Sequence, residues 1–381
     1  FINVLLAKNY FATEKGLALI RGLAEELLWP RVFLSVSAGY GRYSETETPE
    51  LTIVCEHLHT GMNNVRISEY LLEARAELPD GTVLDEASWC IAAPDEKRFS
   101  SLAWCPDISC TGEIDVFVTL SWEGGVLDEY RTGFYRLSDA DMERTLASFV
   151  PVKLDSSVST DFCVRAGRPF PMHGTNYFVT DAFRRCFENM NVLLCRQEMA
   201  QIVSAGINIL RTGIWVGHDL FYSEDGFVSE RAARNLQAFL LTAVKFDLPV
   251  QFVLGASTFD HWDRSRCYIH DPYLIKRARN AFSDFARRFK SFPNVMVDAI
   301  NEPSYSSAGA WRLGRPSGSP YEKEHWHQWL RKKYNDDLSA LRRSWRRTDA
   351  EISSFAECEL PDKTLFEREY NRTYGDYPVY A

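Results

Sequence analysis

From about residue 160 onward, short apolar runs alternate with longer segments whose apolar residues recur every three or four positions. The first pattern predicts buried strands and the second predicts amphipathic helices. The predicted strands are residues 168–177, 207–211, 249–254 and 295–300. The predicted helices are residues 196–205, a long helix after Ser229 and another after Asp271. Strands separated by helices in this order predict parallel βαβ units.

Each of these helices has an end signal in the sequence. Gly206 follows the first helix, where glycine tolerates the left-handed conformation of a C-terminal stop. Ser229 is a suitable N-cap for the second helix. Asp271-Pro272 gives the third helix a cap followed by proline at the first helical position. The local signals therefore agree with the periodicity.

Between residues 41 and 150 the pattern changes to short strands separated by turn sequences. Strand-like runs occur at residues 51–55, 113–120 and 130–135. Glu123-Gly124-Gly125 lies between the last two runs and predicts a β-hairpin. Several short strands at these intervals predict a β-sandwich.

We expect three segments along the chain. They are a remnant or lead-in segment at residues 1–40, a β-sandwich domain at residues 41–150 and a barrel domain at residues 151–381. The first contains an amphipathic helix at residues 14–29, which Pro30 ends. A TIM (β/α)8 barrel needs roughly 250 residues, and four βα units make half of one, so the barrel is expected to be incomplete. An open doubly wound sheet is the competing topology, although the chain lacks G-x-G-x-x-G and Walker sequences.

Charge and composition exclude several classes of partner. The net charge is −9 and the pI about 5.5, so no basic field attracts nucleic acid. The sequence contains no run of about 18 apolar residues, so no transmembrane helix is expected. The nine cysteines form no C-x-x-C pair, which argues against a zinc site and favours a reducing, cytoplasmic compartment. The chain starts at Phe1 rather than Met, so we interpret it as a fragment, and secretion with a removed signal peptide stays open.

Asn301-Glu302-Pro303 is the candidate for chemistry, because it follows the apolar run at residues 295–300. An acidic residue at the carboxyl end of a buried strand lies where a (β/α) barrel builds its active site. A glutamate in this position suits the general acid/base of a glycosidase. The alternative is a turn glutamate that caps the next helix.

Residues from about 167 to 303 resemble the retaining glycoside hydrolases of clan A, the β-galactosidase/cellulase-like superfamily. The matching pieces are Gly167-Arg168-Pro169-Phe170, Gly174-Thr175-Asn176-Tyr177, Gly206-Ile207-Asn208-Ile209-Leu210-Arg211, Phe292-Pro293-Asn294-Val295 and Asn301-Glu302-Pro303. Residues 113–135 look like the immunoglobulin-like module that precedes the barrel in β-galactosidase-type enzymes. The resemblance implies an immunoglobulin-like β-sandwich followed by the N-terminal part of a TIM barrel.

The resemblance also implies roles for individual residues. Glu302 would be the acid/base, Asn301 would donate to the sugar 2-hydroxyl, and Arg211 would hold the nucleophile carboxylate ionised. In the family the nucleophile stands at the end of the seventh strand, so we expect it to be missing from this chain and assign none. The candidate sugar-subsite residues, with ordinary packing as the alternative, are Asn176, Tyr177, Trp215 and Trp262.

We therefore predict a glycoside hydrolase that cleaves β-linked sugars by a retaining mechanism, with little or no activity in this chain alone. The expected partner is a carbohydrate substrate, and no cofactor is expected. No metal is expected, because the pairs His57/His59 and His325/His327 lack a third ligand at suitable spacing. The alternative is a non-catalytic carbohydrate-binding or scaffold protein that kept the barrel. The sugar, the linkage and the oligomeric state stay open.

Overall fold

The computed structural model describes residues 13–28, 31–58, 69–92, 99–215, 218–255, 270–299, 301 and 319–360. The contacts between residues divide the chain into two units. The first comprises residues 1–210 and 230–249, and the second comprises residues 211–229 and 250–381. Both units combine helices with β-sheet, so the fold is mixed α/β.

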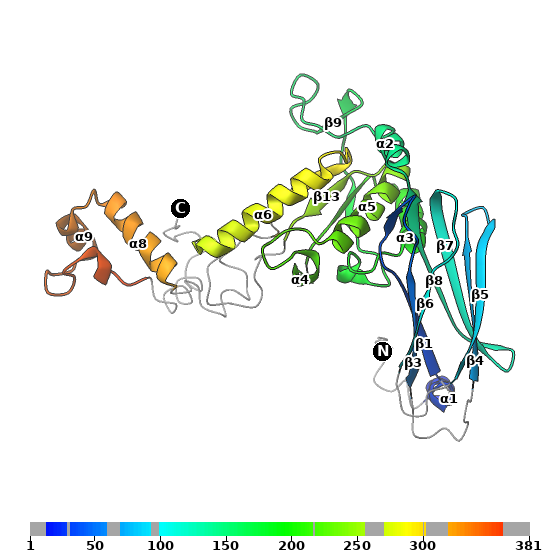
Figure 1. The fold of residues 1–381 in the computed structure, drawn as a ribbon. Helices are drawn as coiled ribbons and strands as arrows, with labels where there is room; N and C mark the ends of the chain where they lie inside the picture. The colour runs from blue at the N-terminus through cyan, green and yellow to red at the C-terminus, as the bar shows by residue number, and fades with distance from the viewer. Residues whose placement is uncertain are drawn as a thin grey trace. The chain divides into compact units, whose positions relative to one another are not determined.

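Two sheets form the N-terminal part of the first unit (Figure 1). A three-stranded sheet has the order β1-β3-β6, and a five-stranded sheet has the order β2-β8-β7-β4-β5. The strands are β1 (Arg31–Ala38), β2 (Arg42–Ser44), β3 (Leu51–Leu58), β4 (Glu69–Glu77), β5 (Val83–Ala92), β6 (Phe99–Trp104), β7 (Gly112–Trp122) and β8 (Gly125–Leu137). All pairings are antiparallel except that of β2 with β8.

One hydrophobic core joins the two sheets. Along β4 every second residue is buried, as the period of a strand with one solvated face requires. The buried side chains include Val36 and Ile53 from the smaller sheet and Leu72, Val116 and Phe134 from the larger one. The two sheets therefore share a core through their facing surfaces.

The sheet begins earlier in the chain than the sequence indicated. β1 pairs with β3 along its whole length, although residues 31–38 fall within the expected lead-in segment. The helix expected at residues 14–29 is confirmed as α1 (Glu14–Leu28). Leu17 and Ile20 on this helix are exposed to solvent.

Three helices of the first unit lie against the larger sheet or one another: α2 (Asp139–Ala147), α3 (Val192–Ser204) and α5 (Glu230–Lys245). The Asn191 side chain caps α3 by accepting from the Leu194 N–H, so the helix starts four residues before the predicted start at residue 196. Gly206 at its end has a φ of 81°, as the predicted C-terminal stop requires. Tyr135 of β8 and Thr242 of α5 share a buried hydrogen bond of 3.0 Å.

The prediction of a single strand at residues 168–177 was wrong. The chain instead forms a short antiparallel pair, β9 (Val164–Arg165) with β10 (Arg168–Pro169), and then β11 (Gly174–Asn176). Pro169 and Pro171 lack the N–H that a continuous ladder needs, which explains the break. A short 3₁₀ helix, η2 (Phe183–Arg185), follows.

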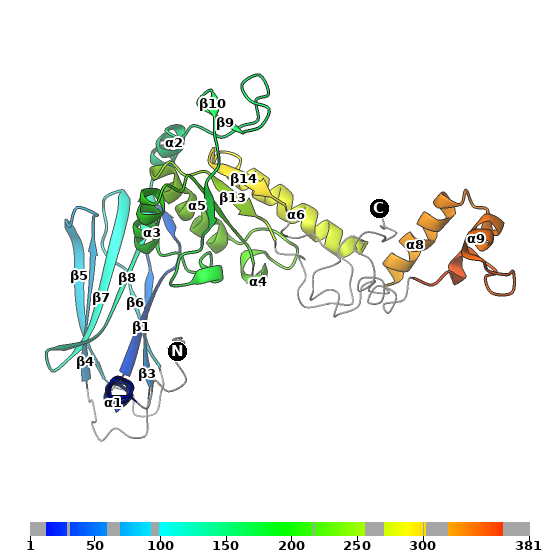
Figure 2. The same ribbon diagram turned by 180° about the vertical axis from the view of Figure 1, so that it is seen from behind.

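The second unit contains a βαβ element (Figure 2). β13 (Val250–Val253) pairs in parallel with β14 (Val295–Asp298), and α6 (Pro272–Phe289) connects them. Asp271 caps α6 by accepting from the Tyr273 N–H at 2.9 Å, as its sequence predicted. The rings of Phe252 and Phe285 stack at 5.2 Å, which packs α6 on β13.

β12 (Ile209–Gly213) belongs to a four-stranded sheet with the order β11-β12-β13-β14. A short helix, α4 (His218–Phe221), follows β12. The described C-terminal helices are α8 (Pro320–Lys333), α9 (Leu338–Trp345) and the 3₁₀ helix η3 (Phe355–Glu357). They bury a core of their own that includes Trp326, Leu330 and Leu341.

None of the helices in the described part of the chain is long and apolar enough to cross a membrane.

Candidate functional site

Of the residues predicted to form the site, Glu302 and Trp262 lie outside the described residues. Arg211, Trp215 and Asn301 belong to the second unit, and Asn176 and Tyr177 belong to the first. The site can therefore be built from the carboxyl ends of β12, β13 and β14.

Backbone hydrogen bonds bring these three strand ends into line. The Ile214 N–H donates to the Val253 carbonyl at 3.0 Å, and the Leu254 N–H donates to the Asp298 carbonyl at 2.9 Å. The Asn301 N–H donates to the Gly255 carbonyl at 2.8 Å. Asn301 is therefore fixed by its backbone beside the end of β13.

Gly213 permits the close approach of β12 and β13. A Cβ atom on Gly213 would lie 2.3 Å from the Val253 carbonyl oxygen, closer than any real contact. The strand that carries Arg211 therefore needs glycine two residues further on.

The Arg211 guanidinium makes two hydrogen bonds across the strand ends. Its Nη2 donates to Asp298 Oδ2 at 3.1 Å and to Asn301 Oδ1 at 2.8 Å. Gln251 Nε2 donates to the same Asp298 oxygen at 3.1 Å. One side chain from each of β12, β13 and β14 therefore meets at the Asp298 carboxylate.

This network sets the orientation of the Asn301 amide. Because Oδ1 accepts from Arg211, the NH₂ group of Asn301 is directed elsewhere and can act as a donor. The Trp215 ring lies 5.4 Å from the Arg211 Cζ, a cation–π distance. A fixed positive charge, an oriented amide donor and an aromatic ring thus lie together.

The network is only partly shielded from water. The side chains of Arg211 and Asp298 are 28% and 23% exposed. A ligand at the strand ends can therefore reach them, whereas a fully buried ion pair could serve only the fold. We call Arg211, Trp215, Gln251, Asp298 and Asn301 the strand-end cluster.

Tyr177 and Asn176 have different surroundings from one another. The buried Tyr177 hydroxyl donates to Glu198 Oε2 at 2.7 Å, and its ring stacks on Phe239 at 5.9 Å. Burial raises the Tyr177 pKa, so the phenol stays protonated. Asn176, at the end of β11, is exposed. A sugar-binding role for either residue stays a prediction.

Asp298 and Gln251 belong to the cluster but were not singled out in the sequence. Both are polar residues inside apolar strand runs, at residues 295–300 and 249–254. A charge at such a position signals a buried partner, and only the three-dimensional structure shows that the partner is Arg211.

A second group of charges lies in the first unit. Arg196 of α3 makes ion pairs with Glu113 and with Asp115, the latter at 2.6 Å, and Lys245 of α5 reaches Glu113 at 2.5 Å. Both carboxylates are buried. Burial raises the Asp115 pKa against the opposing effect of Arg196. This group links two helices to β7, which is a structural role.

Within the described ranges, no group of three histidine, cysteine, aspartate or glutamate residues is placed to hold a metal ion.

No family model matches the chain, and no curated protein matches it in sequence. Among solved structures, the chain is similar to a glycosyl hydrolase family 2 member from Bacteroides cellulosilyticus DSM 14838, with a TM-score of 0.27, 11% identity, and coverage of 76% of this chain and 33% of that one. For a beta-glucuronidase from Parabacteroides merdae the TM-score is 0.27, the identity 12%, and the coverage 76% and 31%. For an FMN-binding beta-glucuronidase from Facaelibacterium prausnitzii L2-6 the TM-score is 0.28 and the identity 12%, with coverage of 81% of this chain and 38% of that one.

The chain thus spans between 31% and 38% of the length of these three proteins. The TM-scores are too low for the likeness to say anything about activity.

Proposed function

We propose that the chain is part of a glycoside hydrolase that cleaves O-glycosidic bonds of β-linked sugars with retention, with Glu302 as the general acid/base. The proposal includes an immunoglobulin-like β-sandwich followed by the N-terminal part of a TIM (β/α)8 barrel. It rests on the residues of this chain.

The observation that carries the proposal is the hydrogen bond between Arg211 and Asn301. It joins β12 to the residue directly before Glu302 and leaves the Asn301 NH₂ group as a donor. A donor beside the acid/base can bind the sugar hydroxyl next to the reacting carbon, a contact that strengthens in the transition state. The cation–π contact with Trp215 adds an aromatic ring to the same place.

The barrel part of the proposal is supported by the parallel unit β13-α6-β14. Val297 of β14 is 56% exposed, although strands of parallel sheets are normally covered on both faces. Among the described strands, β14 is paired only with β13. Closure into a barrel would cover β14 with a neighbouring strand and helix.

The proposed chemistry needs two proton transfers at Glu302. In the first step the protonated Glu302 gives its proton to the leaving oxygen while a carboxylate nucleophile bonds to the anomeric carbon. In the second step the ionised Glu302 takes a proton from water, whose oxygen bonds to the anomeric carbon and releases the nucleophile. No nucleophile is assigned among residues 1–381. Arg211 donates to the Asn301 side-chain oxygen and leaves the Asn301 NH₂ group as a donor.

The test uses the full-length product of the gene and the 381-residue chain, each assayed with 4-nitrophenyl β-glycosides of several sugars. Glu302→Gln in the full-length protein should lower kcat by roughly 10²- to 10⁴-fold, because the leaving oxygen then lacks a proton donor. Saccharide binding, measured by calorimetry, should be retained. A wild-type full-length protein that binds saccharides and hydrolyses none would instead establish the non-catalytic scaffold. Rapid turnover by the short chain would show that it contains a nucleophile.

A further inference from the structure

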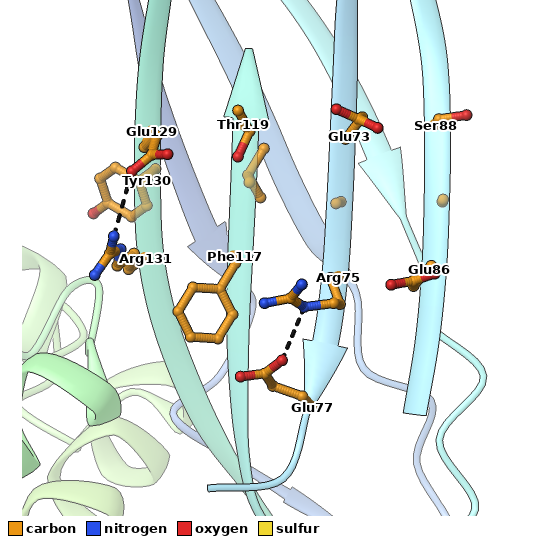
Figure 3. A pocket seen from close by; sticks show the side chains of 13 residues that line it. Glu73, Arg75, Glu77, Glu86, Ser88, Phe117, Thr119, Glu129, Tyr130 and Arg131 are labelled. Atoms are coloured by element: carbon orange, nitrogen blue, oxygen red, sulfur yellow. Dashed lines mark hydrogen bonds and ion pairs between the residues drawn. The ribbon is translucent and has the colours of Figure 1, made fainter. Parts of the chain in front are cut away.

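The outer face of the five-stranded sheet contains a groove of about 660 Å³ (Figure 3). Its lining side chains come from β4, β5, β7 and β8, and all of them belong to the first unit. We call it the sheet groove; the side chains that line it include Glu73, Arg75, Glu77, Glu86, Phe117, Glu129 and Arg131. Its volume falls within the range of about 300–1,000 Å³ that is usual for small-molecule sites.

Strand register places the groove side chains in rows. Arg75 lies opposite Phe117 on β7 and opposite Glu86 on β5, and Phe117 lies opposite Arg131 on β8. Side chains directly opposite one another are on the same face of a sheet and close enough to interact. The Phe117 ring therefore lies between two arginines, as Figure 3 shows.

Both guanidinium groups contact the ring and have acidic partners. The Cζ atoms of Arg75 and Arg131 lie 5.4 and 5.9 Å from the Phe117 ring centroid. Arg75 Nε pairs with Glu77 at 2.8 Å, and Arg131 Nη2 pairs with Glu129 at 3.3 Å. The ion pairs hold the guanidiniums beside the half-buried ring, where most of their N–H groups stay available as donors.

Acceptors are available on the other side of the groove. In the described part of the chain neither Glu73 nor Glu86 has an ion-pair partner, and both side chains line the groove. Glu73 lies opposite Ser88 and Thr119, whose hydroxyls can both donate and accept. A flat apolar ring is therefore surrounded by donors and acceptors.

We infer that the sheet groove is a second ligand site, which binds a neutral oligosaccharide with one sugar ring against Phe117. A sugar ring has apolar faces and a rim of hydroxyls that both donate and accept, which matches an aromatic ring rimmed by guanidinium and carboxylate groups. Arg75 and Arg131 are each paired with a carboxylate, and the two remaining carboxylates of the lining, Glu73 and Glu86, can accept hydrogen bonds from hydroxyl groups. The inference is independent of the strand-end cluster and of any hydrolysis there.

The test is affinity electrophoresis of the 381-residue chain in gels that contain soluble xylan, barley β-glucan or β-1,4-galactan, followed by calorimetry with the matching oligosaccharide. At least one neutral glycan should retard the chain, while polygalacturonate and chitosan should not. Phe117→Ala should weaken binding by roughly three- to tenfold, because the stacking surface is removed. Phe99→Ala is the matched control, since Phe99 is 53% exposed on β6 of the other sheet, and it should leave binding unchanged.

A second variant keeps the test decisive if Phe117→Ala fails to fold. Glu73→Gln/Glu86→Gln removes two carboxylates without breaking an ion pair, so the fold should be retained and binding should fall by a similar factor. Binding that Asn301→Ala weakens and that the groove variants leave intact belongs to the strand-end cluster and contradicts the inference. The inference is overturned if no neutral glycan binds, if only a charged polymer binds, or if a folded groove variant binds as tightly as the wild type.

Discussion

The Arg211 guanidinium donates to the Asn301 side-chain oxygen over 2.8 Å, and this bond decides which way the Asn301 amide faces. The oxygen accepts from the arginine, so the NH₂ group is the part of the amide that is left to donate. The same guanidinium donates to Asp298, which also accepts from Gln251. The orientation of one amide therefore depends on side chains from three strands, β12, β13 and β14.

Asn301→Asp separates the two functions of this amide. The aspartate keeps an oxygen for Arg211 and loses the donor, so the thermal midpoint should change little. If Asn301 donates to the sugar, kcat/KM of the full-length gene product on an aryl β-glycoside should fall by about a hundredfold or more. Unchanged kcat/KM would mean that the amide serves only the fold.

Arg211→Met should destabilise the second unit, because Asp298 then retains only the Gln251 bond among the interactions described above. We expect a loss of about 1–2 kcal/mol in urea denaturation, reduced from the cost in a fully buried pair because both side chains contact solvent. Asp298→Asn in the same background should recover part of the loss, with a coupling energy of about 1 kcal/mol. Strictly additive effects would show that the two side chains do not interact in solution.

Gly213→Ala tests the close approach of β12 and β13. The new Cβ would collide with the Val253 carbonyl oxygen, which is backbone and cannot move aside cheaply. We expect a loss of about 3 kcal/mol in the free energy of unfolding, together with displacement of Arg211. Gly125→Ala is the control, because the nearest atom to its Cβ would lie at an ordinary 3.5 Å. Equal effects of the two substitutions would contradict the packing described for Gly213.

Arg196→Met should leave two buried carboxylates, Glu113 and Asp115, with Lys245 as the remaining cation. The expected loss at pH 7 is about 3–5 kcal/mol, and Arg144→Met, at a largely exposed ion pair, should cost less than 1 kcal/mol.

The loss should depend on pH in a defined direction. Burial raises the pKa of Asp115, so its protonated form favours the fold. That contribution is complete below the unfolded pKa of about 3.9 and disappears as pH rises through the folded value. Arg196 opposes this rise in the Asp115 pKa, so its removal makes Asp115 easier to protonate in the folded protein. The loss of stability caused by Arg196→Met, measured by urea denaturation, should therefore be smaller at pH 4 than at pH 7. A deficit that is larger at pH 4 would contradict this assignment.

Local signals in the sequence predicted the elements whose ends are fixed by neighbouring residues. Asp271-Pro272 predicted the start of α6, and the turn between β7 and β8 follows from Glu123-Gly124, both with positive φ. The pairing of β1 with β3 was not predictable in this way, because it depends on strands that are distant in the sequence.

The strand-end cluster was predicted in part for the same reason. Arg211 and Asn301 are polar residues at strand ends, which a pattern can identify. Asp298 and Gln251 can interact with one another and with Arg211 only because β12, β13 and β14 lie side by side in the sheet. Likewise Glu113 and Asp115 alternate as if they faced water, and it is α3 and α5 that bury them.

The most direct test of Glu302 as the acid/base is the leaving-group dependence of Glu302→Gln in the full-length gene product. The 2,4-dinitrophenolate of a 2,4-dinitrophenyl β-glycoside leaves without being protonated, so the glycosylation step of this substrate should be nearly unaffected. A phenyl β-glycoside should lose roughly 10³-fold or more in kcat/KM. Azide should restore turnover and give the β-glycosyl azide. An equal loss for both substrates, or no loss for either, would contradict the account.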